Sequence, residues 1–66
     1  MKNFITFIAV AEKQDNVEID VDISCIESII DGRVMNNPAV TQINMKSGIR
    51  FFVNHTLTEV RNKIKQ

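Results

Sequence analysis

The chain has 66 residues, which is enough for one small domain and too few for two folding units or an elaborate catalytic cleft. With 44% hydrophobic and 24% charged residues, two Gly and one Pro, it has the composition of a globular protein and not of a disordered or repetitive one. Eight basic and eight acidic side chains cancel, so the net charge gives no sign of a nucleic-acid or membrane partner. We therefore expect a single folded domain over residues 1–66.

A domain of this size needs something besides its core to stabilise it. A single small core rarely supplies more than about 3 to 5 kcal/mol, and small domains usually add disulfides, a metal or a partner chain. Cys25 and His55 are the only residues of their types, which excludes an intrachain disulfide and a zinc site that needs two or more Cys or two or more His ligands from one chain. We expect no metal site and no cofactor, and we expect a homo-oligomer.

The first apolar run, Phe4 to Ala11, follows Lys2 and has the pattern of a short secretory signal. It is only about eight residues long and is rich in aromatic and β-branched residues, which are typical of a strand. Because both faces of this strand are apolar, it is either central in a covered sheet or part of an intermolecular contact made by Ile5 and Phe7. No stretch approaches the roughly 20 apolar residues that span a bilayer, so we expect a cytoplasmic protein without a membrane partner.

Polar residues at 13–16 predict a turn, and strict alternation from Val17 to Ser24 then predicts a half-buried antiparallel strand. Its carboxylates, spread along one strand face, indicate a solvated surface that discourages edge-to-edge aggregation more than they indicate a cation site. The next segment, 25–30, has a spacing that fits a helical turn or a bent strand; we favour a short turn followed by a third strand. Turn signals at Asp31-Gly32 and at 36–38 enclose a predicted loop.

The last two strands form the most secure pair in the sequence. Alternation over 40–46 and again over 49–54 encloses Ser47-Gly48, which predicts a tight hairpin. The run Thr56 to Glu59 then matches a capping box and begins a helix with an apolar stripe at Leu57, Val60 and Ile64. The fold class is therefore α+β: a small antiparallel β-meander of four to five strands with one C-terminal α-helix packed on the sheet.

The order of these motifs resembles the FlbD-type (SwrD-like) family of small flagellar and swarming-motility proteins. The resemblance depends on the run from Val17 to Ile29, on the run from Thr41 to Gly48 with the strand after it, and on Glu59-Val60 in the helix. The same stretch is similar to the LytTR DNA-binding modules, which share a strand that leads into a hairpin. Asn54-His55 replaces the Lys-Glu pair of the FlbD-type pattern, and the loop over 32–39 is longer, so a partner-specific role does not carry over.

The zero net charge conceals two oppositely charged halves. Residues 1–31 hold two basic and seven acidic groups, a balance of −5, and residues 32–66 hold six basic groups and one acidic group, a balance of +5. This segregation fits pairing between strands, head-to-tail contacts between copies, or a basic surface for an anionic ligand. The candidate residues for an anionic ligand are Arg33, Lys46, Arg50, Arg61, Lys63 and Lys65.

No group of residues in the sequence has the pattern of a catalytic site. His55 has no Ser or Cys near it in sequence, and Cys25, which lies among isoleucines, is typical of an inert core thiol. In the strand over 49–54, one face must receive the helix, and the other then presents Phe52 beside Arg50, as in a protein interface or a base-stacking platform.

We therefore predict a non-enzymatic, oligomeric protein-interaction module that acts as an adaptor or regulator by binding a protein partner. Its predicted interface residues are Ile5, Phe7 and Phe52. The alternative is a binder of nucleic acid or of an anionic nucleotide through the basic C-terminal half.

Overall fold

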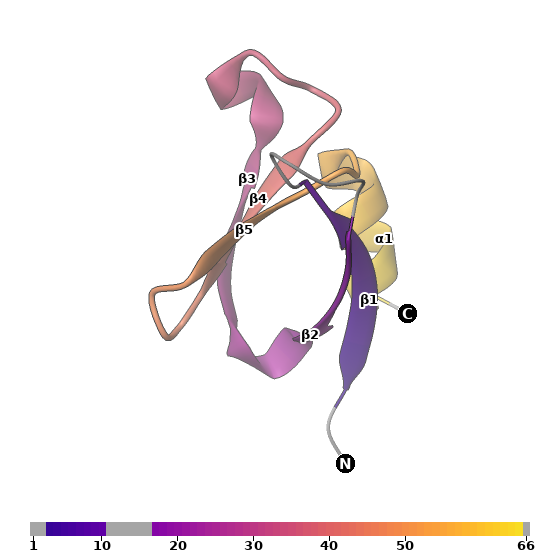
Figure 1. Ribbon diagram of the computed structural model, residues 1–66, viewed down its shortest axis with the longest axis vertical. Coiled ribbons are helices and arrows are strands. Elements are labelled where there is room, and N and C mark those ends of the chain that lie inside the picture. The colour runs from indigo at the N-terminus through magenta and orange to yellow at the C-terminus, as the bar shows by residue number, and fades with distance from the viewer. Residues whose placement is uncertain (1–2, 11–16, 66) are drawn as a thin grey trace.

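The computed structural model describes residues 3–10 and 17–65, which form five strands, two 3₁₀ turns and one α-helix (Figure 1). In chain order these elements are β1 (Phe4–Ala9), β2 (Val17–Asp22), η1 (Ile23–Cys25), β3 (Ile26–Asp31), η2 (Gly32–Met35), β4 (Thr41–Met45), β5 (Arg50–Val53) and α1 (Leu57–Lys65). The predicted α+β class is confirmed, and the strand count is the upper of the two expected values.

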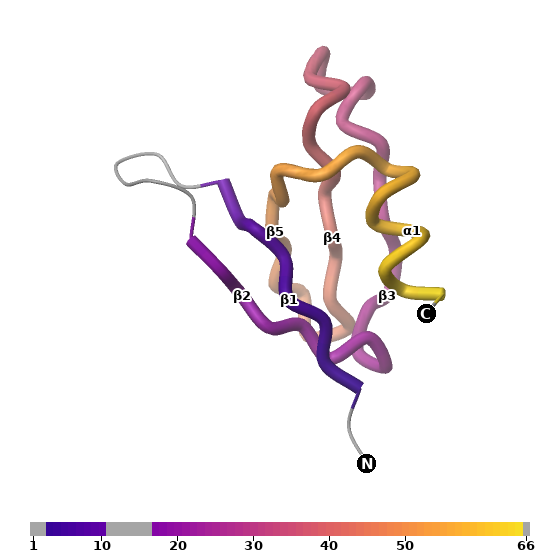
Figure 2. Tube along the Cα trace, turned by 90° about the vertical axis from the view of Figure 1, so that its right-hand side faces the viewer, coloured from indigo at the N-terminus to yellow at the C-terminus, as the bar shows by residue number. Residues whose placement is uncertain are grey.

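All five strands belong to one antiparallel sheet with the order β2-β1-β5-β4-β3. If this sheet were flat, its outer strands would lie about 19 Å apart, since neighbouring strands are about 4.8 Å apart. The outer strands β2 and β3 are nevertheless joined by the three residues of η1, which rise only about 2 Å each. The sheet must therefore curl, and Figures 1 and 2 show the β1–β2 hairpin facing the β3–β4–β5 strands.

The core lies inside the curled sheet because every strand contributes its inward-facing residues to it. Phe7 of β1, Val21 of β2 and Ile43 of β4 meet Val53 of β5 and Val60 of α1, and all five are buried. The alternation predicted from Val17 to Ser24 is present up to Asp22, with Ile19 and Val21 toward the core; the strand ends two residues earlier than predicted, because Ile23 and Ser24 lie in η1. Partly buried residues from β3, β5 and α1 complete this cluster.

The segment after β2 resolves the ambiguity in the sequence spacing. Asp22 caps η1, since its Oδ1 accepts the N–H of Ser24 at 3.0 Å, and β3 then begins at Ile26. The prediction of a short turn followed by a third strand is confirmed. The predicted loop that follows contains the 3₁₀ turn η2, whereas the predicted turn at 13–16 lies outside the described residues.

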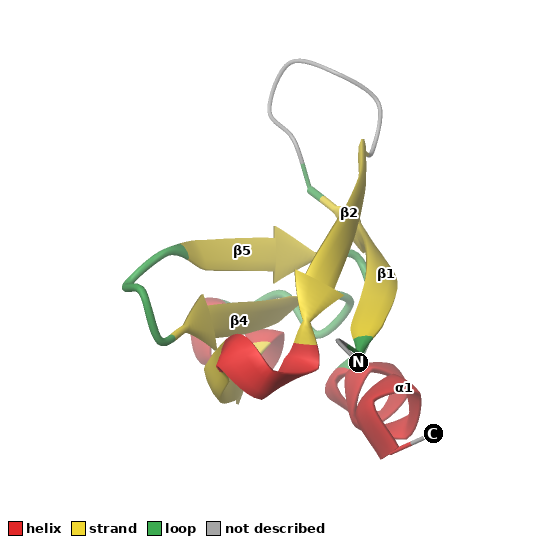
Figure 3. Ribbon diagram, turned by 90° about the horizontal axis from the view of Figure 1, so that it is seen from below, coloured by secondary structure: helices red, strands yellow, loops and turns green. Residues whose placement is uncertain are grey.

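The C-terminal helix begins as the capping box predicts. The Thr56 N–H donates to Oε1 of Glu59 at 2.9 Å, and the Glu59 N–H donates to Oγ1 of Thr56 at 3.2 Å. The helix lies beside β1 in Figures 1 and 3 and contacts β3, and its Val60 and Ile64 pack into the core. Among the described residues, no helix is long and apolar enough to cross a membrane.

Candidate protein interface

The outer face of the β3–β4–β5 strands carries an aromatic side chain, Phe52, that does not pack in the core. Register places Ile30 opposite Gln42, and Gln42 opposite Phe52, in one row across three strands. The row continues to Val10, whose N–H donates to the carbonyl oxygen of Phe52 at 2.7 Å. Phe52 is 38% exposed and Val10 47% exposed, so the row presents apolar surface to solvent.

A second row on the same face is polar and lies beside the first. It consists of Ser28, Asn44 and Arg50, which are opposite one another in register. The Gln42 side-chain amide donates to Oδ1 of Asn44 at 2.7 Å, and Asn44 in turn donates to Oγ of Ser28 at 3.0 Å. We call the two rows together the Phe52 face: Val10, Ser28, Ile30, Gln42, Asn44, Arg50 and Phe52.

Arg50 gives the Phe52 face a positive charge. Its side chain is exposed, and it forms no ion pair with any residue in the described parts of the chain. The predicted division of β5 is confirmed, because Phe51 and Val53 pack in the core while Arg50 and Phe52 face outward. Aromatic residues and Arg are enriched at the centres of protein interfaces, so this face has the composition of a contact surface.

The first strand does not supply the interface residues that the sequence predicts. Phe7 is fully buried in the core and touches the His55 ring edge-to-face, so it is not accessible to a partner and its assignment to an interface is wrong. Ile5 is half-buried and packs against the same core. The two apolar faces of β1 left open a central place in a covered sheet or a contact between copies, and the curled sheet encloses one of these faces.

Sequence reasoning missed Val10 and Ile30, which flank Phe52 and Gln42 in the row. Val10 lies in the same alternation as Phe4, Thr6 and Ile8, but only the pairing of β1 with β5 brings it beside Phe52. Ile30 belongs to the isoleucine-rich segment over 25–30, whose spacing fits a helical turn or a strand, so the sequence did not show which way its side chain faces.

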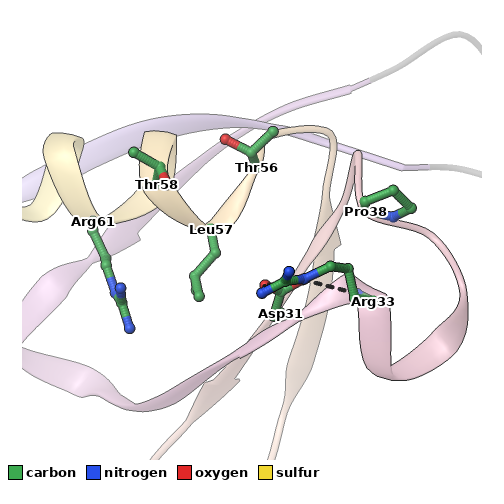
Figure 4. A pocket seen from close by; sticks show the side chains of 7 residues that line it. All are labelled: Asp31, Arg33, Pro38, Thr56, Leu57, Thr58 and Arg61. Carbon is green, nitrogen blue, oxygen red and sulfur yellow. Dashed lines mark hydrogen bonds and ion pairs between the residues drawn. The ribbon is translucent and has the colours of Figure 1, made fainter.

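The six predicted anion-binding residues fall into separate groups. Lys46 and Arg50 flank the β4–β5 turn, whereas Lys63 and Lys65 lie on α1, on the other side of the molecule in Figure 1. Arg33 and Arg61 line a shallow pocket of about 310 Å³ between η2 and the start of α1 (Figure 4). No single surface therefore unites the six.

The pocket already holds a carboxylate of the chain itself. Asp31 accepts the Arg33 N–H at 2.8 Å and pairs with the Arg33 guanidinium at 2.9 Å. These two hydrogen bonds, together with the charges of Arg33 and Arg61, lower the pKa of Asp31 below its ordinary value. Thr56, Thr58 and Leu57 complete the pocket on the helix side.

The two candidate reactive side chains lie in different surroundings. Cys25 is exposed in η1, with its Sγ 3.7 Å from Oδ2 of Asp22, so the prediction of a core thiol is wrong. The short 3₁₀ turn places this residue at the surface, while the neighbouring Ile26 packs against the core. His55 instead contacts Phe7, Ile8 and Thr41. Over residues 3–10 and 17–65, no group of three or more His, Cys, Asp or Glu side chains is arranged to hold a metal ion.

Comparison with known proteins gives no relative of this chain. No family model matches the chain, and no curated protein or solved structure does so either.

Proposed function

We propose that this protein is a non-enzymatic interaction module that self-associates through the Phe52 face. The observation that carries the proposal is the row formed by exposed Val10 and Phe52 and half-buried Ile30, on the face opposite the helix-covered core. A small single core also gains stability when a partner covers apolar surface.

The test compares two phenylalanines, both on strands and both exposed. In Phe52→Glu the new carboxylate lies beside Arg50, and in the control Phe4→Lys the new ammonium lies opposite Asp22. Each new charge has an opposite charge nearby, so repulsion does not unfold either variant. We expect size-exclusion chromatography with light scattering to give an oligomer for the wild type and for Phe4→Lys, and a folded monomer for Phe52→Glu. A monomeric wild type at micromolar concentration, or an oligomeric Phe52→Glu, would contradict the proposal.

The second candidate function is binding of a nucleic acid or an anionic nucleotide. Arg50 beside Phe52, with the amides of Gln42 and Asn44 nearby, combines a cation, a stacking ring and hydrogen-bonding groups on one strand face. We expect such binding to weaken steeply with salt and to be lost in Arg50→Gln. Fluorescence anisotropy with a labelled single-stranded oligonucleotide measures the salt dependence and the effect of Arg50→Gln; no binding at low salt would rule out the nucleic-acid function.

A further inference from the structure

The contact between β1 and β5 is short, and a side chain completes it. β1 pairs with β2 over six residues, but its register with β5 contains the single pair Ala9 and Val53. Two backbone hydrogen bonds flank that pair, each 2.7 Å long: the Val10 N–H donates to the Phe52 carbonyl, and the Asn54 N–H donates to the Ile8 carbonyl. We call this contact, between residues 8–10 and 52–55, the β1–β5 seam.

The imidazole of His55 takes the place of the next backbone acceptor in the seam. The Ile8 N–H donates to Nε2 of His55 over 3.1 Å. An imidazole nitrogen that accepts a hydrogen bond carries no proton, so the seam requires the neutral ring with its proton on Nδ1. The residue is also held in place, because the Oγ1 hydroxyl of the buried Thr41 donates to the His55 backbone carbonyl at 2.8 Å and the His55 ring packs against Phe7.

Protonation of the ring converts its acceptor into a donor. Two N–H groups would then face each other, and the half-buried Ile8 N–H would lose its partner, which costs free energy. Among the elements packed around the ring, α1 carries the charged groups. The Glu59 carboxylate interacts with His55 and stabilises the positive ring, which opposes this cost, and Lys63 lies one turn farther along the helix. The contacts from β1 and β4, which are Phe7, Ile8 and Thr41, carry no charge.

We propose that His55 is a proton-operated latch that closes the β1–β5 seam when neutral and releases it when protonated. The inference does not depend on the proposed function, although Val10 and Phe52 belong to both the seam and the Phe52 face. Acidification therefore loosens the attachment of the β1–β2 hairpin at this corner, while the pairing of β3 with β4, which lacks such a side-chain acceptor, is unchanged.

Nitrogen NMR of the ring tests the closed state directly. The chain contains one His, so the two ring nitrogens give signals that need no further assignment to a residue. We expect the neutral ring to carry its proton on Nδ1. A proton on Nε2 of the neutral ring would overturn the proposal, and this measurement needs no variant.

Amide hydrogen exchange tests the release. On acidification from about pH 8 to about pH 5, we expect the protection of the Ile8 amide to fall about tenfold after correction for intrinsic exchange. The Ile43 amide, in the β3–β4–β5 part of the sheet, is the internal control and keeps its protection. Equal behaviour of the two amides would overturn the latch.

Two variants separate the acceptor from the charge. His55→Gln keeps an acceptor oxygen that does not titrate, so the protection of Ile8 becomes independent of pH. His55→Phe keeps a ring against Phe7 without an acceptor, so Ile8 exchanges rapidly throughout the pH range. If Ile8 protection in His55→Gln still falls on acidification as in the wild type, the latch is not His55.

Discussion

At the scale of single residues, the buried Thr41 stabilises the fold through a hydrogen bond as well as through packing. Its Oγ1 donates to the His55 carbonyl at the junction between β5 and α1, and its exposed fraction is 0%. Thr41→Val keeps the shape and removes the donor, leaving a part-buried carbonyl without that bond. We expect a loss of about 1 to 3 kcal/mol in the free energy of unfolding, measured by urea denaturation. Thr41→Ser keeps the hydroxyl; it should retain the bond to His55 and lose only the contribution of one methyl group.

The two glycines are required for different reasons, although both occur at predicted turns. A Cβ on Gly32 would collide with the carbonyl oxygens of Asn37 and Val40, which are backbone atoms that cannot move aside. Gly48 has open space around it but a φ of +96°, which disfavours any L side chain. We expect Gly32→Ala to cost about 3 kcal/mol or more and Gly48→Ala about 1 kcal/mol, as compared by thermal unfolding. Equal losses would contradict the close approach at Gly32.

At the scale of elements, the capping box makes the stability of the first turn of α1 depend on pH. Hydrogen bonds from the backbone and side chain of Thr56 lower the pKa of Glu59 below its usual 4.5. A lowered carboxyl pKa in the folded state contributes stability above the unfolded pKa, and that contribution is lost as the pH falls through the folded value.

The variant Glu59→Gln isolates this contribution, because it keeps a side-chain acceptor without the charge. We expect Glu59→Gln to be less stable than the wild type at neutral pH and to approach it as the pH falls below about 4. Urea denaturation over this pH range measures the difference. A stability gap that does not change with pH would mean that the carboxylate charge has no role at the helix start.

The elements that were predictable from sequence are those specified by local chemistry. Alternation identified β2 and the β4–β5 hairpin, and the Thr56 and Glu59 pair located the first turn of α1. What local chemistry cannot specify is how strands distant in sequence pair. The pairing of β1 with β5 closes the sheet around Phe7, which buries a residue that the sequence pattern left equally suited to an interface. The same pairing places Val10 beside Phe52.

At the scale of the whole molecule, the opposite charges of the two halves are not matched across the sheet. Glu18, Asp20 and Glu27 form no ion pair within the described residues, and the Thr6 hydroxyl, not a cation, donates to Asp20 at 2.6 Å. β2 lies at one end of the strand order and pairs with β1 alone among the described strands. An end strand offers unpaired backbone groups to other chains, and charged side chains on such a strand oppose that pairing.

We therefore expect the acidic side chains of β2 to oppose aggregation through this end strand, a role that needs no basic side chain of the same chain to pair with them. The double variant Glu18→Thr with Asp20→Thr replaces two charges on β2 by a residue of high strand propensity. Exposed charges contribute little to stability, so we expect the free energy of unfolding to change by less than about 1 kcal/mol while aggregation accelerates. Light scattering against time at a fixed concentration measures the aggregation, and Lys65→Thr on α1, which removes an exposed charge away from a strand edge, is the control. Aggregation of the control at the same rate would attribute the effect to net charge, whereas aggregation of the double variant alone locates the protection at the β2 edge.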